Sequence, residues 1–147
     1  MRTLLLGVGL CFVSVMAYAG AGMKSYAVDI GGGTVAPISL PEELVEGYRA
    51  NMSSAAKAIK NCEAGDYVAK NTMLGRDLHF KVAVGGYGCK LDLQQYNSWN
   101  YHCQLTKKQA DALSEAMTER IATDAVLGDF SDKEKSVLYS ECTMSRQ

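Results

Sequence analysis

Cysteine is the residue type with the clearest chemistry in this chain, which has five cysteines in 147 residues. Cys11 lies in an apolar N-terminal run, and the other four are Cys62, Cys89, Cys103 and Cys142. No two of them have the Cys-x-x-Cys spacing that is typical of zinc and thiol-redox sites. An even number of cysteines in an exported chain instead predicts disulfide bonds, formed in an oxidising compartment.

Residues 1–19 have the features of a signal peptide. Arg2 gives a positive start, residues 4–16 form an uncharged apolar run, and Ala17 and Ala19 are small residues where signal peptidase reads the chain. The run is too short for a membrane-spanning helix, which needs about 20 apolar residues. We therefore expect cleavage after Ala19 and a periplasmic or secreted protein, most simply a bacterial one.

The chain that remains has the size of one small domain with a core of its own. The formal net charge of the full chain is −1, so it lacks the basic excess that is typical of nucleic-acid-binding proteins. No later segment is apolar enough to span a membrane. We expect a glycine-rich arm over residues 20–38 and a single α+β domain over residues 39–147.

Helical periodicity predicts a first helix that carries Cys62 to the sheet. Ser39 and Glu42 have the spacing of a capping box, with Pro41 in the first turn. A single apolar stripe then follows at helical spacing: Leu44, Tyr48, Met52, Ala55, Ile59 and Cys62. Because Gly65 ends the pattern, we expect Cys62 at the end of this helix, on its buried side.

Apolar and polar residues alternate in several short segments after this helix, which predicts a half-buried antiparallel meander. The four expected strands are residues 67–71, 78–84, 89–93 and 99–105. Two registers fit the second and third strands, one with Lys81 opposite Lys90 and one with Lys81 opposite Asp92. Opposite charges that face each other stabilise a sheet by about 0.2–1 kcal/mol and like charges destabilise it, so we predict Lys81 opposite Asp92.

Two C-terminal helices complete the expected fold. Capping-box spacing marks the start of each helix: Thr106 with Gln109, and Ser131 with Glu134. The last helix is expected to have Leu138 and Cys142 on one face. The predicted fold class is α+β, with an N-terminal helix, a four-stranded antiparallel meander and two C-terminal helices packed on one sheet face, held by disulfides.

The expected sheet also suggests how the cysteines pair. A three-residue loop that ends at Asn97, a residue that tolerates the left-handed conformation, places Cys89 opposite Cys103 at a Cα separation of about 4.5–5.5 Å. By elimination, Cys62 then pairs with Cys142. A two-residue shift of this hairpin would separate Cys89 from Cys103, and the alternative pairing is Cys62–Cys89 with Cys103–Cys142.

Residues 28–35, with the sequence Val-Asp-Ile-Gly-Gly-Gly-Thr-Val, resemble the phosphate-binding loop of the actin and heat-shock ATPase superfamily. In that superfamily the glycines let backbone amides approach phosphate groups. The superfamily also needs two large lobes and further nucleotide motifs, for which this chain is too short. We therefore interpret the glycines as a flexible hinge after a strand from Lys24 to Ile30, and we expect no nucleotide cofactor.

The two histidines, His79 and His102, both fall on the polar face of the expected sheet. A metal site needs at least two converging ligands, and in the expected registers the strand over residues 89–93 separates the two histidines. No combination of acid, base and nucleophile is evident in the sequence. We therefore expect neither a metal site nor a catalytic site.

Aromatic residues near the expected sheet ends are the best candidates for contact with a partner. They are Tyr87, Tyr96 and Trp99, and tryptophan and tyrosine are the residue types most enriched at binding hot spots. Trp99 has the same strand parity as Cys103, so the alternative role for Trp99, together with Tyr101, is to cover the core under the helices.

These observations favour a small exported protein that binds another protein, as an assembly factor, an inhibitor or an immunity protein, and that has no catalytic activity. The alternatives are a carrier of a small apolar ligand held between helix and sheet, and a small periplasmic enzyme. A concave pocket with converging polar groups would favour the enzyme, a dry cavity under the meander would favour the carrier, and an exposed aromatic patch would favour the protein partner.

Overall fold

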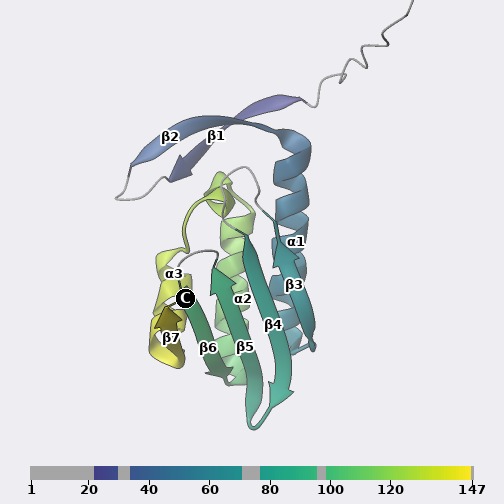
Figure 1. Ribbon diagram of the computed structural model, residues 1–147, viewed down its shortest axis with the longest axis vertical. Coiled ribbons are helices and arrows are strands. Elements are labelled where there is room, and N and C mark those ends of the chain that lie inside the picture. The colour runs from purple at the N-terminus through teal and green to yellow at the C-terminus, as the bar shows by residue number, and fades with distance from the viewer. Residues whose placement is uncertain (1–21, 30–33, 71–76, 96–98, 147) are drawn as a thin grey trace, which may run out of the picture.

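The computed structural model describes residues 22–29, 34–70, 77–95 and 99–146 (Figure 1). The expected signal peptide and its cleavage site lie outside these residues. The elements follow in the order β1 (Met23–Asp29), β2 (Val35–Pro41), α1 (Glu42–Asn61), β3 (Gly65–Ala69), β4 (Leu78–Gly85), β5 (Gly88–Gln95), β6 (Trp99–Leu105), α2 (Lys107–Ile121), the 3-10 helix η1 (Asp124–Leu127), α3 (Asp132–Glu141) and β7 (Cys142–Arg146).

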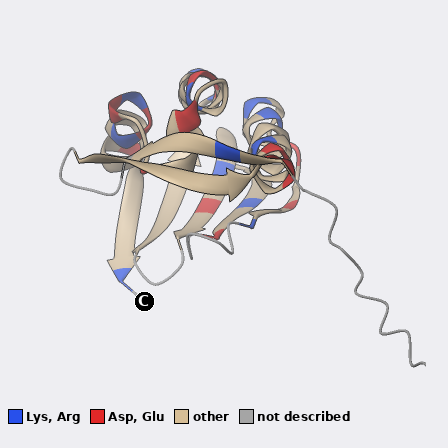
Figure 2. Cartoon of the chain, turned by 90° about the horizontal axis from the view of Figure 1, so that it is seen from above, with Lys and Arg blue, Asp and Glu red and all other residues tan. Residues whose placement is uncertain are grey.

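One antiparallel sheet, with the strand order β3-β4-β5-β6-β7, forms the centre of the fold. The three α-helices lie together on one side of it, as the view from above shows (Figure 2). Along β4, β5 and β6, buried apolar side chains alternate with mostly polar exposed ones, and the buried side chains face the helices. The α+β class with all helices on one sheet face is therefore confirmed, as is the register with Lys81 opposite Asp92.

The sheet has a fifth strand that the sequence analysis did not anticipate. The last helix was expected to include Cys142, but α3 ends at Glu141, and Cys142 begins β7, where it lies opposite Cys103. The side chains of β7 after Cys142 are all exposed. Buried and exposed positions do not alternate along them, so the local sequence gives little indication of a strand. Pairing with β6 makes this segment a strand.

The first helix differs from its prediction at the N-terminus. Ser39 was expected to cap the helix, but it belongs to β2 and pairs with Ser25 of β1, and Pro41 occupies the N-cap position without a side-chain hydrogen bond. The buried face also begins one residue later than expected, because Val45 is buried and Leu44 is exposed.

The segment expected to be a glycine-rich arm pairs with itself where the structure describes it. Strands β1 and β2 form a separate hairpin, which lies across the end of the domain where α1 begins (Figure 1). Tyr26, Val28 and Leu40 of this hairpin are buried in the core. The glycine hinge proposed for residues 31–33 lies outside the described residues.

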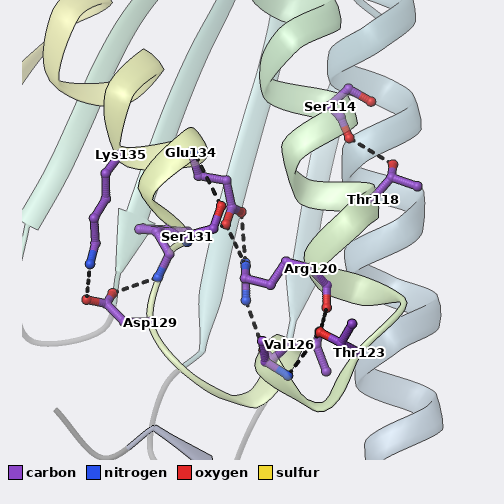
Figure 3. A network of polar contacts seen from close by, with 11 residues as sticks. Ser114, Thr118, Arg120, Thr123, Val126, Asp129, Ser131, Glu134 and Lys135 are labelled. Carbon is purple, nitrogen blue, oxygen red and sulfur yellow. Dashed lines mark hydrogen bonds and ion pairs between the residues drawn. The ribbon is translucent and has the colours of Figure 1, made fainter. Parts of the chain in front are cut away.

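Helices α2 and α3 begin at the two predicted capping boxes, and a buried ion pair joins them (Figure 3). Arg120 of α2 donates to both carboxylate oxygens of Glu134 of α3, at 2.7 and 3.0 Å, and to the carbonyl of Val126 in η1 at 3.0 Å. Glu134 also accepts the backbone N–H of Ser131 at 2.7 Å. This network fixes α3, and α3 in turn determines where β7 starts.

Candidate functional site

Among the described residues, one disulfide is present, between Cys103 of β6 and Cys142 of β7, with a Cα separation of 4.1 Å. The two bridges favoured from the sequence, Cys89–Cys103 and Cys62–Cys142, are therefore wrong. Cys62 and Cys89 are both thiols in the structure. The disulfide joins the edge strand β7 to its neighbour β6.

The reason for this error is the register of β5 and β6. Cys89 lies opposite Leu105, and Leu91 lies opposite Cys103, which is a two-residue shift from the expected pairing. The parity of the strands is unchanged, so Cys89 and Cys103 are both on the buried face as expected. They are in neighbouring rows of the sheet rather than facing each other.

The open face of the sheet carries a row of polar residues, one from each strand. Asp66, Lys81, Asp92, His102 and Thr143 follow one another across β3 to β7 in paired positions. The first three alternate in charge, which favours this register on both sides of β4. A row of this kind is typical of a sheet face that is in contact with water.

Three polar side chains on this face form a connected line that the sequence analysis did not anticipate. The Nδ1 atom of His102 is 2.7 Å from an Asp92 carboxylate oxygen, and its Nε2 atom is 3.3 Å from the Ser145 hydroxyl. The order carboxylate, imidazole, hydroxyl is the one found in Ser-His-Asp hydrolases, where the carboxylate orients the ring and the ring takes the hydroxyl proton. The line is therefore the best arrangement for chemistry on the open face.

The surroundings of this line differ from those of an enclosed active site. The side chains of His102 and Asp92 are 51% and 59% exposed. The hollow beside Asp92 has a volume of about 210 Å³ and is lined by residues of β3, β4 and β5. Strands β5 and β6 are interior strands, so their amides are used in the sheet and cannot serve as donors to an oxyanion.

The aromatic residues singled out from the sequence do not form one surface. Tyr87 is fully exposed at the turn between β4 and β5, whereas Trp99 begins β6 at the other end of the sheet. Tyr96 lies outside the described residues. The alternative role expected for Tyr101 and Trp99 was to cover the core under the helices. Tyr101 is buried, in agreement with that role, but Trp99 is 43% exposed.

Trp99 instead belongs to an exposed apolar patch at the edge of the sheet. Tyr139 of α3 stacks on Tyr101, with ring centroids 6.5 Å apart, and Met144 of β7 lies opposite Tyr101 in the sheet. Trp99 precedes Tyr101 by two residues and so lies on the same face of β6. Tyr139 and Met144 are 56% and 50% exposed. We call Trp99, Tyr139 and Met144 the Trp99 patch. The positions of Tyr139 and Met144 depend on α3 and β7, so strand parity in the sequence does not reveal them.

The clefts on the helical side are open and are lined largely by charged and polar residues. One, of about 680 Å³, lies between α1 and α2 and is lined by Ser53, Lys57, Lys60, Asp111, Ser114, Glu115, Thr118, Glu119 and Ala122. Another, of about 530 Å³, lies between α2 and α3 and has Glu115, Glu119, Asp132 and Lys133 among its lining residues. Charged linings of this kind do not suit a small apolar ligand.

Three further observations concern metal ligands, membrane-spanning helices and similarity to known proteins. Within residues 22–29, 34–70, 77–95 and 99–146, no three His, Cys, Asp or Glu side chains come together as metal ligands. In the same part of the chain, no helix is both long and apolar enough to cross a membrane. Comparison with family models, curated proteins and solved structures finds no match. The function must therefore be argued from the geometry of this chain.

Proposed function

We propose that this chain is an exported protein-binding module that contacts its partner through the Trp99 patch. The observation that carries the proposal is the exposure of three large neighbouring side chains, Trp99, Tyr139 and Met144, beside the buried ring of Tyr101. Tryptophan, tyrosine and methionine are enriched in protein interfaces, and a contiguous apolar patch on a small protein is typical of a binding surface.

The position of the patch suggests how the partner binds. The patch lies beside β7, an edge strand of the five-stranded sheet. An extended segment of another protein can pair with such an edge, so that backbone hydrogen bonds supply affinity and side-chain contacts supply specificity. In this arrangement the partner strand would lie along β7, and its apolar side chains would contact Tyr139 and Met144.

Export is part of the same proposal. The apolar N-terminal run predicts a signal peptide, and the Cys103–Cys142 disulfide is of a kind that persists in oxidising compartments such as the bacterial periplasm. Intact-mass measurement of protein secreted or released from the periplasm tests this part: the mature chain should begin at Gly20. Recovery of the full-length chain from the cytoplasm, with reduced cysteines, would contradict it.

Site-specific photo-cross-linking tests the binding surface in living cells. A photoreactive residue at position 139 should yield a discrete cross-linked product with another protein, and Trp99→Ser in the same chain should remove most of that product. The matched control has the photoreactive residue at position 87, which is also exposed but lies at the far end of the sheet. Equal products from both positions, or a product at position 139 that Trp99→Ser leaves unchanged, would contradict the proposal.

A second candidate function is acyl transfer with Ser145 as the nucleophile, and the Asp92–His102–Ser145 line favours it. The Ser145 oxygen would attack an activated ester while His102 takes its proton and Asp92 stabilises the resulting imidazolium. Time-resolved mass spectrometry with an activated phenyl ester tests this function, because acylation should occur at Ser145 and be lost in His102→Gln. Acylation that is equally fast in His102→Gln would exclude the mechanism.

A further inference from the structure

The two remaining thiols meet where the end of α1 contacts the hairpin of β4 and β5. The Cys62 sulfur is 3.5 Å from the carbonyl oxygen of Ala83 and 3.7 Å from that of Gly88. Cys89 directly follows Gly88 and pairs with Val84, the residue after Ala83. The Cys62 side chain also contributes to the raised pKa of Cys89, which agrees with the two thiols being neighbours.

The backbone holds both residues in these positions. Cys62 ends α1 in the left-handed conformation, with φ of 50°, and its N–H donates to the carbonyl of Ile59 at 3.2 Å. On the other side, the backbone of Gly88 lies so close to β6 that an added Cβ would be 1.9 Å from the Leu105 carbonyl oxygen. The end of the helix and the hairpin are therefore both fixed, and Cys62 and Cys89 are held near each other.

The two thiols differ in their access to solvent. Cys89 is buried, and burial, followed by the hydrogen bond and charge of Cys62, raises its pKa to about 12. A thiol that stays protonated is a poor nucleophile and a poor metal ligand. Cys62 is only partly buried, so a reagent from solution reaches Cys62 first.

We propose that Cys62 and Cys89 are the site of a second disulfide, closed by a disulfide donor in the compartment where Cys103–Cys142 forms. The Cys62 thiolate attacks one sulfur of the donor, which forms a mixed disulfide and releases the first donor thiol. Cys89 then attacks the Cys62 sulfur while its proton passes to the departing donor sulfur, and the second donor thiol leaves. In balance, two protein thiols are oxidised to one disulfide, and the donor disulfide is reduced to two thiols.

The two bridges would act on the two edge strands of the sheet in different ways. The loop closed by Cys62 and Cys89 contains the edge strand β3 together with β4, while Cys103–Cys142 holds the opposite edge strand β7. With both bridges closed, α1 is tied to the central strand β5 and β7 is tied to its neighbour β6. Detachment of β7 then requires breaking a covalent bond, and unfolding of β3 and β4 is limited by the closed loop that contains them.

Peptide mapping of the exported protein tests the proposal without a substitution. Trypsin places the four cysteines after residue 20 on four separate peptides, residues 61–70, 82–90, 91–107 and 136–146. After thiols are blocked at acidic pH, a non-reducing digest should contain residues 61–70 linked to residues 82–90. The link between residues 91–107 and 136–146 serves as the internal control for oxidation.

Two single variants test the order of the reaction with glutathione disulfide. In Cys89→Ser, Cys62 should retain one glutathione as a mixed disulfide, whereas in Cys62→Ser the folded protein should react much more slowly because Cys89 is buried. The proposal is overturned if residues 61–70 and 82–90 both carry blocked thiols while the control link is complete. It is equally overturned if residues 61–70 are linked to residues 136–146.

Discussion

Glu134 binds Arg120 through both of its carboxylate oxygens, and both side chains of this ion pair are buried. The same carboxylate accepts the Ser131 N–H and so completes the capping box at the start of α3. One side chain therefore both starts α3 and attaches it to α2. Since β7 follows α3 directly, Glu134 also affects where the Trp99 patch lies.

Replacement of Glu134 by alanine is expected to destabilise the protein by about 3–5 kcal/mol, because it leaves the charge of Arg120 buried without its partner. Urea-induced unfolding of wild type and variant measures this loss. The matched control is Glu119→Ala, which removes the partner of Lys133 from an exposed ion pair and should have little effect on stability. Similar losses of unfolding free energy in the two variants would contradict the prediction that burial makes the Arg120–Glu134 pair more important for stability than the exposed pair.

Two glycines are expected to respond in opposite directions to the same substitution. In Gly88→Ala the new Cβ would overlap the carbonyl of Leu105, so β5 and β6 must separate and thermal stability should fall strongly. In Gly47→Ala the Cβ meets no atom within 4 Å, and alanine in a helix is favoured by roughly 0.5–1 kcal/mol over glycine. Melting temperatures of both variants check the prediction, and a stable Gly88→Ala would contradict the packing of β5 against β6.

The burial of Cys89 predicts a dependence of stability on pH in the alkaline range. The pKa of Cys89 is raised from 9.0 to about 12, mainly by burial, so the folded state retains a proton that the unfolded state loses. Stability is therefore complete below about pH 9 and falls as the pH rises towards 12. A Cys62→Ala variant, which cannot form the second disulfide, should show this fall, and Cys62→Ala/Cys89→Ala should show less of it when urea unfolding is measured across this range. Identical pH profiles would contradict the burial of the thiol.

Local rules predicted the parts of the fold in which neighbouring residues decide the structure. The capping boxes at Thr106 and Ser131 correctly place the starts of α2 and α3, because the side chain and the backbone group it satisfies are three residues apart. The pairing of Lys81 with Asp92 correctly sets β4 against β5. In each case the deciding contact is short-range in sequence or lies across one hairpin.

The rule that opposite charges face each other across a sheet also applies to the register of β5 and β6. The expected register places His102 opposite Lys90, whereas the structure places it opposite Asp92 at hydrogen-bonding distance. The charge of Asp92 favours the register of the structure, whereas the turn preference of Asn97 favours the other register. The register expected from Asn97 gives the wrong disulfide pairing and separates His102 from Asp92.

Strand β7 and the Trp99 patch could not be predicted in this way. Cys142 and Met144 acquire their positions from pairing with β6, from the disulfide to Cys103 and from the placement of α3. These are contacts between segments that are distant in sequence. Sequence analysis therefore identified Trp99 as a candidate for contact with a partner but could not identify Tyr139 and Met144 as its neighbours.

The affinity of the purified protein for the partner identified by cross-linking is the most direct test of the proposed function. Trp99→Ala should weaken binding by about 2 kcal/mol or more, as expected for a hot-spot residue, which is roughly a 30-fold rise in Kd. Tyr87→Ala, at the opposite end of the sheet, should leave Kd unchanged. The proposal that this chain binds its partner through the Trp99 patch would be contradicted if Trp99→Ala, folded as shown by an unchanged melting temperature, bound with the wild-type affinity.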